Sequence, residues 1–217
     1  MRRLALALFA LALATASRAQ ERTYVDVGSP NFQPLPIAVA PFQGEAADVV
    51  ADVVRSDLAL SGLFDVLDPK GFLAEAAEGF AAPSIRFARW ADVGADGLAK
   101  ARVTRSGTEL VGELHLYEVR AGREVLAKTV RAPAADPRAL GHHVADEIVR
   151  HYTREPGVFS TRIVAIRKAR GLFELVLFDA DGKNARVLLS ERTILLTPAW
   201  RPDGSEILVT SYRSGYP

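Results

Sequence analysis

The 217-residue sequence contains no cysteine, and this absence excludes several classes of site at once. Disulfide bonds, thiolate catalysis and thiolate metal sites cannot form, and no lipobox cysteine exists to carry a lipid anchor. Stability must therefore come from burial of apolar side chains. Hydrophobic residues make up 49% of the chain, whose length supports one or two cores.

Catalytic motifs are also missing: no G-x-S-x-G, P-loop or G-x-G-x-x-G pattern occurs. His143, Glu147 and His151 share one face of a predicted helix, but they spread over about 12 Å and cannot converge on one metal ion. We expect them to form a solvated face. Trp90 and Trp200 lie among small and apolar residues, so packed core positions are favoured over stacking platforms for sugars or bases. The sequence predicts no enzyme, cofactor or metal site.

An aspartate-rich segment loosely resembles a calcium loop, with Asp179, Asp181, Gly182 and Asn184. An EF-hand loop, however, needs more carboxylates and a glutamate at its twelfth position, where this chain has Ser190. A tight hairpin turn explains the Asp-Gly pair without an ion. The turn is therefore our prediction.

The only long apolar run is Leu4–Ala14, which follows two arginines. Ser17 and Ala19 then form a small-residue cleavage site before Gln20. Eleven apolar residues are too few to span a bilayer, so residues 1–19 are predicted to be a signal peptide cleaved after Ala19. We expect a periplasmic protein that is not inserted in the membrane.

Charge gives no case for a polyanionic partner. Without residues 1–19, the chain has 24 basic and 26 acidic residues, a formal net charge of −2. Such a balance does not attract nucleic acid or anionic membrane.

The region after the leader alternates strand and helix patterns. Ile37–Phe42 is a short, fully apolar strand, and Ala46–Leu60 has apolar residues at a helical period. Gly62 ends the helix and Phe64–Leu67 reads as a second strand, which makes a β-α-β unit. Short helices are predicted at Phe72–Glu78 and Arg86–Ala91.

Three further runs separated by turns predict an antiparallel meander: Gly97–Arg105, Glu109–Glu118 and Glu124–Arg131. Alternation of apolar and polar residues in the middle run indicates that one face of this strand is exposed to solvent. Asp136 is the N-cap of a last helix that begins with proline and runs to about Tyr152. Pro156 and Gly157 then close this region.

The rest of the chain reads as strands. Leu172–Phe178 and Arg186–Leu189 flank the aspartate turn, and a second hairpin turns at Pro202-Asp203-Gly204. Two hairpins would make one four-stranded propeller blade. Because a lone blade needs neighbours to bury its faces, we expect the chain to be incomplete at its C-terminus.

The predicted fold class is an α/β domain with a mixed sheet, followed by the first blade of an all-β propeller. The predicted organisation is a signal peptide (1–19), an extended partner-binding segment (20–34), the α/β domain (35–156) and the partial propeller (157–217).

These features together resemble the TolB family of the Tol–Pal cell-envelope system. The matching stretches are Pro36–Phe42, the D-L-x-x-S-G-x-F run from Asp57 to Phe64, Trp90 with Gly94-Ala95-Asp96, Gly141–Ile148, Gly157–Ile163 and Leu196–Ser205. The A-W-x-P-D-G piece alone is common among propellers. In this order behind a leader the pieces are specific, and they span nearly the whole mature chain.

The resemblance implies a monomeric, non-enzymatic adaptor. Members of the family engage the inner-membrane protein TolA through an N-terminal peptide and the lipoprotein Pal through the propeller. The matching peptide is Gln20–Phe32, with expected TolA-binding residues Glu21, Arg22, Thr23, Tyr24, Val25, Asp26 and Val27. An extended peptide of this kind can add a strand to a partner's sheet.

Two other classes stay open on the sequence. One is an exported propeller peptidase, which would need a Ser-Asp-His domain after the propeller. The other is a ligand-binding α/β sensor domain of the periplasm. The full-length gene would decide the peptidase, and pull-down of envelope proteins, as opposed to binding of small molecules, would separate an adaptor from a sensor.

Overall fold

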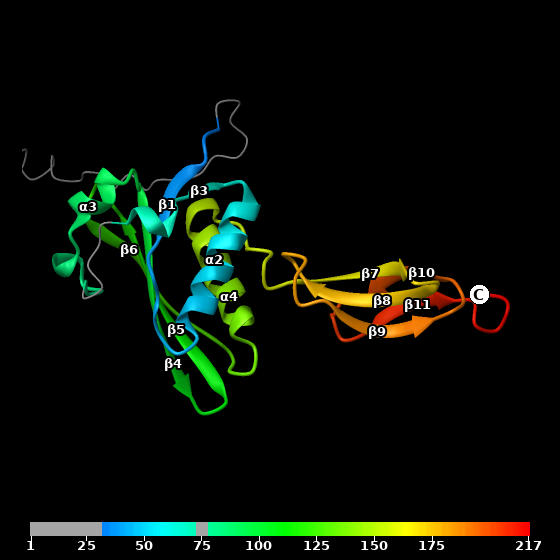
Figure 1. Ribbon diagram of the computed structural model, residues 1–217. Helices are drawn as coiled ribbons and strands as arrows, with labels where there is room; N and C mark the ends of the chain where they lie inside the picture. Colours follow the sequence, from blue (N-terminus) through cyan, green and yellow to red (C-terminus); the bar gives the residue numbers. More distant parts are fainter. Residues whose placement is uncertain (1–31, 73–77) are drawn as a thin grey trace, which may run out of the picture.

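The computed structural model describes residues 32–72 and 78–217, which form an α/β part (residues 35–153) and a β part (residues 162–211) (Figure 1). A six-stranded sheet of order β3-β1-β4-β5-β6, with β2 beside β4, organises the α/β part. Its strands are β1 (Leu35–Val39), β2 (Gln43–Gly44), β3 (Phe64–Val66), β4 (Gly97–Ser106), β5 (Glu109–Glu118) and β6 (Arg123–Pro133). β1 runs parallel to β3 and β4, whereas β4, β5 and β6 are antiparallel. The predicted mixed sheet and meander are confirmed.

The predicted β-α-β unit is present at the start of the sheet. Helix α2 (Ala47–Ser61) connects β1 to β3, whose register places Ile37 opposite Val66. The helix ends at Gly62, which has a φ of 68°, a left-handed conformation that glycine adopts without strain. Ile37 is fully buried because both faces of the sheet are covered here.

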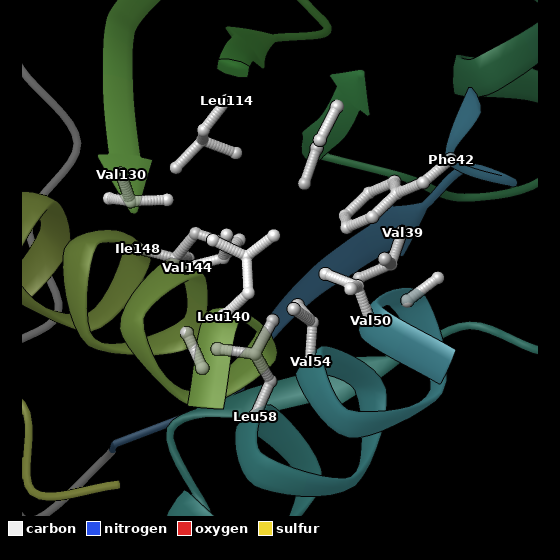
Figure 2. Packing of buried hydrophobic residues seen from close by; sticks show 14 of the residues in the cluster. Val39, Phe42, Val50, Val54, Leu58, Leu114, Val130, Leu140, Val144 and Ile148 are labelled. Atoms are coloured by element: carbon white, nitrogen blue, oxygen red, sulfur yellow. The ribbon is translucent and has the colours of Figure 1, made fainter. Parts of the chain in front are cut away.

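Helices α2 and α4 (Pro137–Thr153) pack side by side against one face of the sheet (Figures 1 and 2). As predicted, α4 begins at Asp136, whose side chain accepts a hydrogen bond from the Ala139 N–H at 3.2 Å. Pro137 stands at the first helical position, where no N–H is needed. The main core lies between helices and sheet and includes Val39, Val50, Val54, Leu58, Leu114, Leu140, Val144 and Ile148.

The opposite face of the sheet carries a second, smaller core. Helix α3 (Phe87–Asp92) and the 3-10 turns η1 (Pro69–Gly71) and η2 (Ala82–Ser84) lie there, and Trp90 is buried as predicted. The prediction that one face of β5 is wet is therefore wrong at its end, where Tyr117 packs under this layer. The expected helix at Phe72–Glu78 falls largely on residues 73–77, outside the described residues.

The β part contains a three-stranded sheet, β7 (Arg162–Ala169), β8 (Leu172–Asp179) and β9 (Arg186–Glu191), and a hairpin, β10 (Leu195–Trp200) with β11 (Ile207–Ser211). Both predicted hairpins are present, β8–β9 and β10–β11.

The prediction that the two hairpins form one four-stranded blade is wrong in the described residues, because β7 pairs with β8 and the hairpins lie in separate sheets. A register shift between Leu196 and Ala199 breaks the β10 ladder where Thr197 has a positive φ and Pro198 lacks an N–H. Trp200, expected in a core, is 37% exposed on this hairpin. Within residues 32–72 and 78–217, no helix has the length and apolar character needed to cross a bilayer.

Candidate functional site

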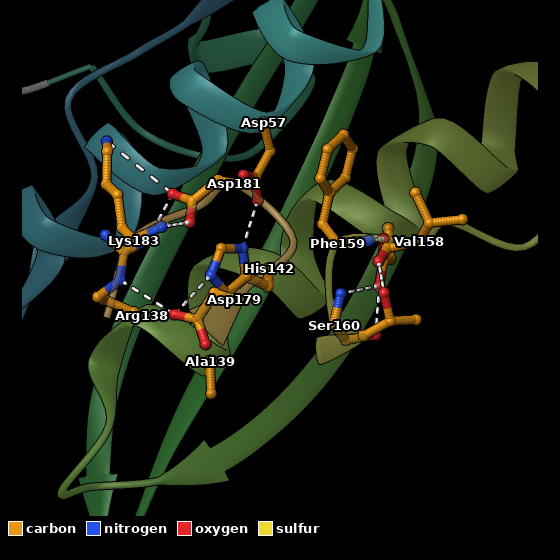
Figure 3. Close-up of polar contacts among 12 residues, drawn as sticks. Asp57, Arg138, Ala139, His142, Val158, Phe159, Ser160, Asp179, Asp181 and Lys183 are labelled. Atoms are coloured by element: carbon orange, nitrogen blue, oxygen red, sulfur yellow. Dashed lines mark hydrogen bonds and ion pairs between the residues drawn. The ribbon is translucent and has the colours of Figure 1, made fainter. Parts of the chain in front are cut away.

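The α/β part and the β part are joined by polar contacts along one side of helix α4. Arg138, His142 and Asp146 recur at every fourth residue, which places them on a single stripe of the helix. All three contact residues of the β part or of the segment leading into it. Asp57, Arg138, His142, Asp179 and Asp181 are here called the junction cluster (Figure 3).

Asp57 on α2 and His142 on α4 form the deepest pair of the junction cluster. The Asp57 Oδ2 and His142 Nδ1 atoms lie 2.6 Å apart, and both residues are buried. Burial raises the pKa of Asp57, against the opposing effect of His142. Burial lowers the pKa of His142, but the hydrogen bond and charge of Asp57, with Asp179 and Asp181, outweigh it and leave that pKa raised. Both directions mean that the pair holds one proton tightly.

The β part contributes the two aspartates of the turn after β8. Asp179 N–H donates to Lys183 O at 3.0 Å and Gly182 N–H donates to Asp179 O at 2.9 Å, so the predicted tight turn is confirmed. Gly182, with a φ of 77°, makes this conformation possible. The turn presents both carboxylates to α4 (Figure 3).

Arg138 connects the two aspartates to the helix. Its Nη2 donates to Asp181 Oδ2 at 2.6 Å and its Nε to Asp179 Oδ2 at 3.4 Å. Burial opposes ionisation of Asp181, but the Lys183 backbone N–H and Arg138 lower its pKa. His142 Nε2 lies 3.5 Å from Asp179 Oδ2 without a hydrogen bond.

Asp146 holds the segment between the two parts. Its carboxylate accepts hydrogen bonds from Phe159 N–H at 2.8 Å and Ser160 N–H at 2.9 Å. Phe159 is thereby seated in the main core. Gly157 passes so close that a Cβ atom there would lie 2.1 Å from Asp146 Oδ1, so only glycine fits.

Asp146→Ala is expected to release this segment, because two N–H groups lose a charged acceptor. A loss of about 1.4 kcal/mol of local stability corresponds to about a tenfold faster proteolytic cut between residues 154 and 161. Timed digestion followed by mass spectrometry measures the rate. Glu147→Ala is the matched control, since Glu147 pairs at the helix surface with Arg150 and Lys128; equal cutting of both variants would contradict the role of Asp146.

The histidine stripe singled out on the sequence lies beside the stripe that makes the junction. His143 and Glu147 line a shallow surface cavity of about 300 Å³, and His151 packs edge-on against Tyr152. Within the described residues, only His142, Asp179 and Asp181 place three potential metal-ligating atoms within 4.8 Å of one another. Sequence reasoning missed His142 because its partners lie far away in the chain. The fourfold spacing of Arg138, His142 and Asp146 was the available signal.

The predicted TolA-binding residues Glu21, Arg22, Thr23, Tyr24, Val25, Asp26 and Val27 lie outside the described residues, as do the leader and its cleavage site. The aspartates rejected as a calcium loop form a turn, as predicted, and this turn contacts the α/β part.

Comparison with known proteins gives concordant matches. Residues 23–125 match the family model of the TolB amino-terminal domain. The chain is 70% identical over its full length to the Tol-Pal system protein TolB of Anaeromyxobacter dehalogenans strain 2CP-1, and 43% identical to that of Myxococcus xanthus strain DK1622, covering 51% of each. The chain thus spans about half the length of these curated relatives. The crystal structure of TolB from Acinetobacter baumannii superposes with a TM-score of 0.70 at 27% identity, over 87% of this chain and 46% of that one.

Proposed function

Since the chain belongs to the TolB family, we propose that it is a non-enzymatic periplasmic adaptor of the Tol–Pal system that links inner-membrane TolA to the lipoprotein Pal. In this role it supports outer-membrane integrity and cell division. The observation that carries the proposal is 70% identity, over the whole chain, to a Tol-Pal system protein.

The junction suits a protein that works through binding surfaces. An adaptor must hold its binding elements in a defined arrangement, and here one helix contacts both parts of the chain. Hydrogen bonds of 2.6 to 2.9 Å join Arg138 to Asp181 of the β part, and Asp146 to the backbone of residues 159–160 in the segment before it. Such charge-assisted bonds favour a fixed orientation over free rotation.

We assign TolA binding to Gln20–Phe32 and Pal binding to the β part. The segment Gln20–Phe32 binds by adding a strand to a sheet of TolA, so most of its affinity comes from backbone groups. Folding back of the same peptide on its own domain would hide it and make binding switchable. Export with cleavage after Ala19 leaves this peptide at the new N-terminus, which mass spectrometry of the periplasmic form tests.

Deletion of residues 20–32 is expected to abolish TolA binding and to leave the thermal midpoint within about 2 °C, because a terminal peptide contributes few core contacts. Isothermal titration with purified TolA and thermal unfolding give the two readings. Full-strength binding by the deleted protein would refute the assignment.

Val25→Pro removes one backbone donor and fixes φ, so it is expected to weaken TolA binding at least tenfold. Val25→Thr keeps the backbone donor and the branched shape, and should weaken binding less than threefold. Equal losses in the two variants would show that a side-chain pocket, and not a backbone ladder, recognises this peptide.

A further inference from the structure

The junction cluster contains a buried nitrogen without a hydrogen-bond partner among the described residues. His142 is 3% exposed, and its Nε2 atom forms no hydrogen bond. Asp57 holds the Nδ1 atom on the other side of the ring. A metal ion binds neutral imidazole and displaces the proton from the nitrogen it bonds, so Nε2 is the atom through which His142 can act as a ligand. A buried nitrogen that faces carboxylates calls for an electropositive group, either a proton or a cation.

The distances around Nε2 fit a metal ion better than a proton. Nε2 and Asp179 Oδ2 lie 3.5 Å apart, which is longer than an N–H···O hydrogen bond. Two ligands on a tetrahedral zinc ion, at 2.0–2.2 Å from it, lie about 3.3–3.6 Å from each other. Three atoms within 4.8 Å of one another share a point no more than about 2.8 Å from each, so closing on zinc takes shifts below about 1 Å.

The charge balance also favours a cation. The side chains of Asp57, Asp179 and Asp181 are at most 10% exposed, and in the described part of the chain Arg138 is the one arginine or lysine whose side chain hydrogen-bonds to any of them. The Lys183 ammonium lies 3.9 Å from Asp181, and its side chain is 58% exposed. When His142 is neutral, as a metal ligand must be, three carboxylates and Arg138 leave two negative charges, which a divalent ion neutralises.

We propose that His142 Nε2, Asp179 and Asp181 bind a divalent transition metal, Zn²⁺ by their chemistry, at the junction of the two parts. One imidazole with two carboxylates suits zinc and is a poor set for calcium, which takes six to eight oxygens. Asp57 would not bind the ion itself but would orient His142, because it pairs with Nδ1, the ring nitrogen that does not face the ion. Arg138 donates to the same aspartates and competes with the ion for their charge.

The ion would connect helix α4 directly to the turn after β8. Its ligands come from both parts, so binding stabilises the junction and not one part alone. This inference does not depend on the assignment of TolA or Pal as partners.

The test is titration of the chelator-treated full chain with Zn²⁺ by calorimetry, and with Co²⁺ by visible absorption, which reports tetrahedral coordination. One ion per chain is expected, with no comparable uptake of Ca²⁺. His142→Gln should weaken Zn²⁺ binding at least 100-fold, and Asp57→Asn, which leaves the ligands in place, by about 10–100-fold. His143→Gln is the matched control on the same helix and should bind as the wild type does.

Arg138→Gln is expected to change Zn²⁺ affinity in the opposite direction. Removal of the Arg138 charge, which competes with the ion for Asp181, should tighten Zn²⁺ binding severalfold. Unchanged Zn²⁺ affinity in this variant would show that the ion does not bind at Asp181. Circular dichroism verifies folding, and Asp181→Asn replaces His142→Gln if the latter does not fold. Absence of Zn²⁺ uptake by the wild type, together with NMR evidence that His142 is protonated at both nitrogens, would overturn the proposal. Loss of Zn²⁺ binding in His143→Gln together with its retention in His142→Gln would overturn it as well.

Discussion

Lys100→Met is expected to lower the free energy of unfolding by about 3 kcal/mol, because removing one partner of a buried ion pair strands the other charge. The Lys100 Nζ and Glu78 Oε2 atoms lie 2.9 Å apart, and both side chains are only 6% exposed. Glu78 also accepts hydrogen bonds from Trp90 Nε1 at 3.1 Å and Arg86 N–H at 2.9 Å, so it cannot turn out into solvent without disturbing the second core. Urea unfolding followed by tryptophan fluorescence measures the loss.

The double variant Lys100→Met/Glu78→Gln separates charge from packing. Glutamine carries no charge and keeps one acceptor oxygen, for either Trp90 Nε1 or the Arg86 N–H, which bond to different oxygens of Glu78, so we expect part of the lost stability to return. If the single and double variants were equally unstable, the Lys100 chain and its contact with the Phe80 ring, not the ion pair, would be the stabilising element.

The carboxylate of Glu78 also makes the free energy of unfolding depend on pH. Burial tends to raise the pKa of Glu78, but the Arg86 N–H, Lys100 and Trp90 outweigh it and leave the pKa below its ordinary value of 4.5. A lowered folded-state pKa contributes stability that is present above the unfolded value and is lost as pH falls through the folded value. Glu78→Gln should therefore flatten the loss of stability below about pH 4.5 relative to wild type. Parallel acid titrations of the two proteins compare the slopes.

Gly141→Val is expected to destabilise the α/β part by about 2–3 kcal/mol, because α2 and α4 approach too closely at this position for a side chain. A Cβ atom at Gly141 would lie 2.6 Å from Val53 Cβ and 3.1 Å from Val50 O. Val53 is nearly fully buried, so the two helices must separate to make room. Thermal unfolding monitored at 222 nm gives the size of the effect.

Two further variants test the cause. Gly141→Ala combined with Val53→Ala should recover stability relative to Gly141→Ala alone, since the clash is removed from the other helix. Gly71→Ala is a neutral control, because nothing lies within 4 Å of the added atom. Additive losses in the double variant would show that the helix crossing is not the constraint.

Local signals in the sequence predicted most secondary elements. The N-cap at Asp136 followed by proline, the Gly62 helix end and the two aspartate-glycine turns each act within a few residues, and all are confirmed. The α/β sheet followed from the apolar run at Ile37–Val39 and the alternating meander. These features depend on neighbouring residues, so no distant contact was needed to infer them.

The pairing of the two hairpins and the burial of Tyr117 could not be read from local pattern. The first depends on which strands pair with β8, and β7 and β9 occupy its two edges. The second depends on α3 and the Glu78–Lys100 pair covering one end of β5. Trp200 was misjudged for a related reason, since composition around a residue does not say what packs over it.

The sequence by itself determined the family, the mixed α/β sheet followed by antiparallel strands, and the positions of the caps and turns. Only the tertiary structure decided that Asp57, His142 and the turn aspartates meet, because His142 lies 85 positions from Asp57 and 37 from Asp179 in the chain. A helix has several polar stripes, and the sequence singled out the one at His143, which it predicted to be a solvated face. The neighbouring stripe of Arg138, His142 and Asp146 became the junction because the β part and the segment before it fold back onto it. Burial there strengthens the interactions between the charged groups and shifts their pKa values.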